Sequence, residues 1–172
     1  CCFNSSYKIT STEFEIWLEI LNKVENSVLW LLDVDETAKS NLYKFLEKFK
    51  ISSNRIIFAK KMNHYDHLER LSHADLFIDT FPYTGHTTAS DALWVGLPVL
   101  TRIGKSFASR VSASLLNAIG LSALVTNSEK EYEDLAIELA TNSPKLKEIK
   151  NKLRNNRNTK PLFNTQIFAR NI

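Results

Sequence analysis

The chain has 172 residues, 44% of them hydrophobic and 24% charged, with a net charge of +3 at pH 7. This length suits one domain or one lobe of a larger enzyme, and the composition provides a sizeable core. The weak charge, the single pair of adjacent cysteines and the lack of a long apolar run argue against a nucleic-acid-binding surface, a disulfide scaffold and a membrane span.

The ends of the chain add to this picture. Cys1 and Cys2 are the only cysteines, which is typical of a protein in a reducing compartment, so we expect a cytoplasmic location. The sequence does not begin with Met and opens directly on apolar residues, so we interpret it as a fragment of a longer protein. The basic run over residues 145–160 is typical of a solvated helix face.

In the first third of the chain, apolar runs alternate with helical patterns. Residues 1–4 are predicted to form the first strand. Apolar residues at helical spacing predict a helix over 12–24, with Ser11 or Thr12 as its cap. The run SVLWLLD predicts a buried strand over 27–33. A second amphipathic helix is predicted over 36–49, which covers the remainder of this third.

The middle of the chain repeats the pattern in shorter elements. A strand is predicted over 56–59, a short helix over 64–73 and a strand over 76–80. The next helix, over 88–95, is predicted to end at Gly96 because glycine commonly terminates helices.

The last third carries two more strands and three helices. The strands are predicted over 98–102 and 123–126, and the helices over 107–119, 128–140 and 144–157. Strands that alternate with helices, and that are apolar throughout, predict a Rossmann-like, doubly wound parallel sheet with helices on both faces. Ligands of such sheets bind beyond the carboxyl ends of the strands.

The densest polar cluster lies at one such strand end, in the stretch DTFPYTGHTTASDALW of residues 79–94. It places His86, Thr87 and Thr88 at a helix start, where free backbone N–H groups and the helix dipole suit a phosphate. Asp91, one turn later, can accept hydrogen bonds from a ribose or sugar hydroxyl. The alternative is an ordinary threonine cap whose hydroxyl turns inward.

This cluster begins a longer stretch, DTFPYTGHTTASDALWVGLPVLTRIGKSFASRVSASLL, that resembles the signature of the O-GlcNAc transferase family. The resemblance is strongest to bacterial members with tetratricopeptide repeats. It continues in order over nearly the whole chain. The other matching segments are residues 3–4, 7–8, 26–32, 54–58, 127–134 and 161–165.

The resemblance implies a GT-B glycosyltransferase, of which residues 1–172 form the second, donor-binding lobe, with terminal helices over 143–172. It implies an inverting, metal-independent transfer of a sugar, N-acetylglucosamine from UDP-N-acetylglucosamine, to Ser or Thr of a protein, without a cofactor. Lys8 matches the family lysine on the donor diphosphate and is the catalytic candidate of this lobe. A positioned lysine would stabilise the leaving nucleotide as its charge develops.

Other family contacts carry over residue by residue. His86, Thr87 and Thr88 match the phosphate-contacting turn, and Asp91 matches the acid on the ribose. One further pair, His67 and Arg70, matches residues beside the nucleobase and shares one helix face.

Three positions depart from the animal members of the family. Ser5 replaces a Gln beside the phosphates, His64 replaces a Lys near the base, and Met62 replaces a small residue whose backbone contacts the base. The base-reading loop is therefore altered while the phosphate turn is intact. The nucleotide and sugar stay open, since the family includes fucosyl- and glucosyl-transferring members.

The catalytic histidine and acid of the family, and most acceptor contacts, belong to the first lobe and to preceding helical repeats. We therefore expect the isolated lobe to be inactive and the protein acceptor to be bound through those missing parts. Two other functions stay open: a binding module that recognises nucleotide sugars without turnover, and another GT-B enzyme such as a nucleotide-sugar epimerase.

Overall fold

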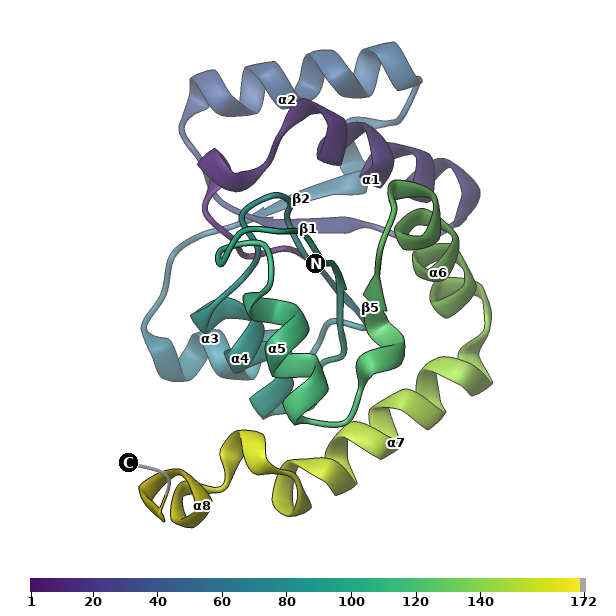
Figure 1. The fold of residues 1–172 in the computed structure, drawn as a ribbon. Helices are drawn as coiled ribbons and strands as arrows, with labels where there is room; N and C mark the ends of the chain where they lie inside the picture. Colours follow the sequence, from purple (N-terminus) through teal and green to yellow (C-terminus); the bar gives the residue numbers. More distant parts are fainter. Residues whose placement is uncertain (171–172) are drawn as a thin grey trace.

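The computed structural model describes residues 1–170 and has the predicted α/β class (Figure 1). The apolar runs form short parallel strands, each followed by a helix. The strands are β1 (Leu29–Leu32), β2 (Ile56–Ala59), β3 (Phe77–Ile78), β4 (Val99–Arg102) and β5 (Val125–Thr126). The helices are α1 (Ser11–Lys23), α2 (Glu36–Phe49), α3 (His64–Leu71), α4 (Thr87–Val95), α5 (Val111–Ala118), α6 (Glu129–Thr141), α7 (Ser143–Thr159) and α8 (Thr165–Arg170).

The N-terminal segment joins two groups of strands into one layer. β1 pairs with β2, and β4 pairs with both β3 and β5, all in parallel. Between the two groups, the Cys2 N–H donates to the Trp30 carbonyl and the Ile78 N–H donates to the Cys1 carbonyl, both at 2.9 Å. The spatial order is therefore β2, β1, the N-terminal segment, β3, β4 and β5, which is the Rossmann order. Its switch point lies between the N-terminal segment and β3.

The strand predicted over residues 1–4 is reduced to a single bridge between Cys2 and Leu31. The chain leaves the ladder after Cys2, and the Asn4 amide bonds to side chains of the next strand end instead. The strand predicted over 76–80 is also shorter than expected. It is an interior strand, and Phe77 is completely buried.

Helices cover both faces of this layer (Figure 1). Helices α1, α2 and α6 pack together on one face, and α3, α4 and α5 pack together on the other. Helix α7 runs from α6 to α4, and α8 follows it at the C-terminal end of the described chain. The terminal helices predicted over 143–172 correspond to α7 and α8, and residues 171–172 lie outside the described part.

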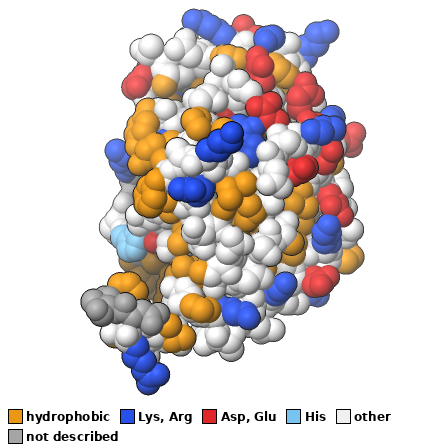
Figure 2. Space-filling view, viewed as in Figure 1, with side chains coloured by type: hydrophobic (Ala, Val, Ile, Leu, Met, Phe, Trp, Pro, Cys, Tyr) orange, Lys and Arg blue, Asp and Glu red, His pale blue; other side chains and the backbone are white. Residues whose placement is uncertain are grey.

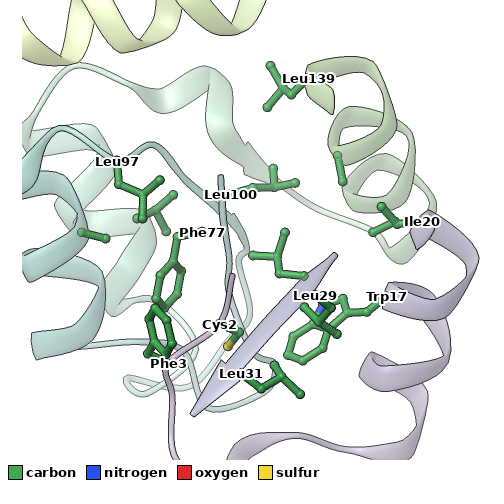
Figure 3. Close-up of a cluster of buried hydrophobic side chains, with 14 of the residues drawn as sticks. Cys2, Phe3, Trp17, Ile20, Leu29, Leu31, Phe77, Leu97, Leu100 and Leu139 are labelled. Atoms are coloured by element: carbon green, nitrogen blue, oxygen red, sulfur yellow. The ribbon is translucent and has the colours of Figure 1, made fainter. Parts of the chain in front are cut away.

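The hydrophobic core lies on both sides of the strands (Figure 3). Trp17 and Ile20 of α1 and Leu139 of α6 approach from one side, while Phe3 and Phe77 lie on the other. Each such side chain contributes roughly 1.5–3 kcal/mol when it leaves water. The core therefore holds the N-terminal segment between the two groups of strands.

Most helices begin with a side chain that accepts a backbone N–H from the third residue along. Thr10 caps α1 in place of the predicted Ser11 or Thr12, and Ser128 caps α6 as its spacing predicted. Helix α4, like α5, has no side-chain cap at its N-cap residue, which is His86 in α4. Its first N–H groups are therefore left open, as an anion site requires.

Helix α5 begins at Val111 rather than at residue 107. The hydroxyls of Ser106 and Ser109 bond to each other at 3.0 Å, and the Ser109 hydroxyl also donates to the Ser106 carbonyl at 2.9 Å. Thr84 bonds to the Ala108 carbonyl through both its N–H and its hydroxyl. These bonds hold the segment before Val111 in a turn.

Two surface properties complete the fold. Figure 2 shows Lys and Arg side chains scattered among acidic and apolar ones, so the described part of this face carries no continuous basic patch. None of the helices in residues 1–170 combines the length and the apolar composition that crossing a bilayer requires.

Candidate functional site

A buried carboxylate at the switch point organises the candidate site. Asp79 directly follows β3 and is only 1% exposed. Its Oδ1 accepts hydrogen bonds from Asn4 Nδ2 at 3.0 Å, the Thr80 N–H at 2.9 Å and the Gly85 N–H at 2.7 Å. Its Oδ2 accepts one from the Thr101 hydroxyl at 2.8 Å. Burial raises the pKa of Asp79, and these hydrogen bonds oppose that shift because they favour the charged form.

The turn after Asp79 is held from several sides. Besides the bonds from Thr84 to Ala108, the Ser112 hydroxyl donates to the Gly85 carbonyl at 2.7 Å. A Cβ at Gly85 would lie 3.1 Å from Asp79 Oδ1, closer than an ordinary contact, so glycine avoids crowding at this close approach. The turn is therefore held in place by the protein's own hydrogen bonds.

The start of α4 presents open donors beyond this turn. The first helical bond runs from the Ser90 N–H to the His86 carbonyl. The N–H groups of Thr87, Thr88 and Ala89 therefore have no backbone acceptor within residues 1–170. The Thr87 side chain is exposed, whereas the Thr88 hydroxyl turns inward and donates to Asn4 Oδ1. An anion bound here would meet mainly backbone N–H groups, with Thr87 as the free hydroxyl.

Lys8 reaches the same turn from the short helical turn η1 (Ser6–Lys8). Its Nζ donates to the Thr84 carbonyl at 3.0 Å and lies 4.0 Å from the centre of the Tyr83 ring. Tyr83 in turn stacks on His86, with ring centres 5.2 Å apart. The structure therefore brings Lys8 and the start of α4 to the same edge of the sheet.

A second group lies beside the N-terminal segment. Arg70 Nη2 is 2.6 Å from His67 Nδ1, and Arg70 Nη1 donates to the Lys60 carbonyl at 2.8 Å. Both side chains pack on Phe3, the Arg70 guanidinium at 4.4 Å from the ring centre and the His67 ring edge-on at 5.4 Å. Burial lowers the pKa of His67, and the Arg70 charge lowers it further. His67 is therefore held in its neutral form near pH 7.

Asp91 connects the two groups. It is half-buried on α4, one turn after Thr88, and its Oδ2 lies 3.9 Å from His64 Nδ1 at the start of α3. Two of the proposed contacts remain on the periphery. The Ser5 side chain is exposed and makes no hydrogen bond within residues 1–170, and Met62 is 46% exposed.

A partly buried ion cluster supports the turn from the other side. Arg102, at the end of β4, lies over the Phe81 ring at 3.8 Å. Its Nη2 is 3.3 Å from Glu13 Oε2 on α1, and its Nη1 is 2.7 Å from Glu129 Oε1 on α6. Burial raises the pKa of Glu13 to about 7, an effect that Arg102 opposes. The cluster ties two helices to the turn that carries the candidate site.

Sequence reasoning missed three contributors to this geometry. The anchoring roles of Asn4 and Asp79 were not foreseen, although polar residues that directly follow strands are a signal for a site in a doubly wound sheet. The ring of Tyr83, which contacts both Lys8 and His86, was also missed. The sequence offers no sign of that contact beyond its position in the turn.

Comparison with known proteins gives a consistent result. The family described as "Glycosyl transferase family 41" matches residues 1–172. The chain is 37% identical, over 99% of its length, to an Arabidopsis thaliana protein named "Probable UDP-N-acetylglucosamine--peptide N-acetylglucosaminyltransferase SEC". It is 33% identical, over its full length, to the Caenorhabditis elegans UDP-N-acetylglucosamine--peptide N-acetylglucosaminyltransferase. The chain spans 18% and 15% of the lengths of these two relatives.

A solved structure shares the fold. A mutant of the Thermobaculum terrenum O-GlcNAc transferase superposes with a TM-score of 0.85 at 32% sequence identity. The match covers 90% of this chain and 30% of that structure. The relatives are thus plant, animal and bacterial, and a special likeness to bacterial members with tetratricopeptide repeats stays a prediction.

Proposed function

Because this chain belongs to glycosyltransferase family 41, we propose that it is the donor-binding lobe of an inverting, metal-independent transferase. The transferase moves N-acetylglucosamine from UDP-N-acetylglucosamine to Ser or Thr hydroxyls of a protein. The names of the relatives support the sugar and the peptide acceptor. The resemblance of the sequence to the family supports the inverting, cofactor-free chemistry.

The observation that carries the proposal is the pairing of Lys8 with the uncapped start of α4. An ammonium and a row of open N–H groups lie on one edge of the sheet, at its switch point. When the bond from the sugar to the diphosphate breaks, negative charge grows on the phosphate oxygens. Donors that are already in place stabilise that charge without reorganisation. Lys8 is thus the proposed catalytic residue of this lobe.

The second group of residues fits the nucleoside end of the donor. Asp91 accepts hydrogen bonds from the ribose hydroxyls in this proposal. The neutral His67 imidazole stacks on the base, and Arg70 fixes that ring through its contact with Nδ1. A uracil base suits this arrangement, with Met62 and His64 at its outer edge and Ser5 beside the phosphates.

The acceptor is held by other parts of the protein. An inverting transfer requires the acceptor hydroxyl in line with the sugar carbon, and we assign no residue of this lobe to that task. The relatives are several times longer than this chain, and their remaining length provides for a first lobe and helical repeats. We therefore expect the isolated lobe to bind donor without transferring sugar. The free cysteines fit a cytoplasmic location.

Steady-state kinetics on the full-length protein test the proposal. Replacement of Lys8 by Ala should lower kcat by about 10²–10³, the typical loss for one donor to a developing charge. Lys147, exposed on α7, is the matched control, and Lys147→Ala should retain wild-type turnover. A thermal melt checks that both variants fold.

Three outcomes count against the proposal. A Lys8→Ala variant with turnover within about threefold of wild type removes Lys8 from the chemistry. A large drop in the melting temperature of Lys8→Ala shows instead that the role of Lys8 is structural. Binding of the donor by the wild-type protein without any transfer to peptides indicates a nucleotide-sugar-binding module.

A further inference from the structure

We propose that Tyr83 is a positioning residue for the donor diphosphate, because its ring holds both the Lys8 ammonium and the His86 imidazole beside the start of α4. This inference rests on the proposed function, since it concerns the same anion site. It adds a residue that neither the sequence pattern nor the comparisons assign.

The contact with Lys8 is the first step. The ammonium has three N–H donors, of which one is used by the Thr84 carbonyl at 3.0 Å. The ring centre of Tyr83 lies 4.0 Å from Nζ, within the range of a cation–π interaction. Burial lowers the pKa of Lys8, and the charge of Asp79 opposes that shift. The ring and the Thr84 carbonyl therefore hold the ammonium in place, with donors left for an anion.

The contact with His86 is the second step. The Tyr83 and His86 rings are nearly parallel, with an interplanar angle of 24°. His86 Nε2 is buried and has no hydrogen-bond partner within residues 1–170. The ring is thus held by packing against Tyr83, together with an edge contact from Phe107 at 6.2 Å. His86 is the N-cap residue of α4, so the stack also fixes the open end of that helix.

Tyr83 can serve this role without being part of the core. Its side chain is 41% exposed, and its hydroxyl makes no hydrogen bond to any described residue. The backbone is held independently, because the Thr80 hydroxyl donates to the Tyr83 carbonyl at 2.7 Å. Loss of the ring should therefore release Lys8 and His86 while leaving the turn and the fold intact. Loss of the hydroxyl alone should have little effect.

The experiment uses the full-length protein and four variants: Tyr83→Phe, Tyr83→Leu, Lys8→Ala, and the double variant with Tyr83→Leu and Lys8→Ala. Kinetics with UDP-N-acetylglucosamine and a peptide give kcat and KM, and calorimetry gives the Kd of UDP. Tyr83→Leu should lower kcat about fivefold, the size expected for a cation–π contact at a partly exposed site. Tyr83→Phe should stay within about twofold, because the ring is retained. When Lys8 is already replaced by Ala, the further change Tyr83→Leu should lower kcat only slightly.

The control is Tyr43→Leu on α2, a partly exposed tyrosine far from the turn in sequence, which should leave kcat unchanged. Three results overturn the inference. The first is that the effects of Tyr83→Leu and Lys8→Ala on kcat are strictly additive, and the second is that Tyr83→Phe loses as much turnover as Tyr83→Leu. The third is that Tyr83→Leu is more active than wild type, which would show that the ring obstructs the site. If the wild-type protein binds no uridine nucleotide, the proposed function itself fails. If the wild-type protein binds the nucleotide and transfers sugar but the two substitutions act additively, only the role of Tyr83 is overturned.

Discussion

The wild-type protein should lose stability as the pH rises from 5 to 8, because Glu13 titrates over that range. The Glu13→Gln variant should not show this loss. Glu13 is 1% exposed, and its Oε1 has no partner within residues 1–170. Burial raises the pKa of Glu13 from 4.5 to about 7. Arg102 lowers this pKa, whereas the nearby carboxylates of Glu129 and Asp79 raise it.

The direction and the size of the effect follow from these two values. The folded state holds a proton that the unfolded state has already released above pH 4.5. The stabilisation is therefore complete below that pH and is lost as the pH rises through about 7. Between pH 5 and 8, the free energy of unfolding should fall by about 2–3 kcal/mol through Glu13 alone. Gln fills the same volume, keeps an acceptor for Arg102 and does not titrate.

Urea unfolding at pH 5, 6, 7 and 8 measures this difference directly. The free energy of unfolding of Glu13→Gln, relative to that of wild type, should rise from pH 5 to pH 8. Glu19, exposed on the same helix, provides the control, and Glu19→Gln should follow the wild-type curve. Parallel curves for wild type and Glu13→Gln would show that Glu13 is ionised in the folded state throughout, and the reasoning would fail.

Three further predictions concern the turn and the ligand. A Gly85→Ala change places a Cβ 3.1 Å from Asp79 Oδ1, so it should lower the free energy of unfolding by about 1–3 kcal/mol; an unchanged denaturation midpoint contradicts this. A Tyr132→Phe change removes the hydroxyl that accepts from Trp17 Nε1 and donates to the Asp79 carbonyl. It should lower the free energy of unfolding by about 1–3 kcal/mol in the same assay. A smaller loss means that these groups find other partners. Titration with nucleotides should show tighter binding of UDP than of GDP, and equal or reversed affinities would refute the base assignment.

The order and type of the elements could be predicted because they depend on local patterns. Apolar runs and helical spacing identified every strand region and each helix from α1 to α7, and the α/β class followed from their alternation. The errors occur where distant residues decide the local structure. The segment before Val111 has helical composition, but Thr84 pins the Ala108 carbonyl and keeps it in a turn.

The candidate site could be predicted only in part, for the same reason. The open start of α4 is visible as a polar cluster after a strand. The contacts that fix it join residues about 75 positions apart, such as Asn4 with Asp79 and Lys8 with Thr84. A pattern within one sequence carries no information on such pairs. The inward turn of the Thr88 hydroxyl is one consequence, since it depends on Asn4.

The N-terminal segment explains why the two halves of the site lie together. Phe3 packs against His67 and Arg70, and the next residue, Asn4, bonds to Asp79 and the Thr88 hydroxyl. Successive side chains of an extended chain point to opposite sides, so one dipeptide at the switch point serves both groups. The segment is itself fixed by backbone bonds to β1 and β3. In the proposed donor site, the distance between the residues assigned to the nucleoside and those assigned to the diphosphate is thus set by the sheet.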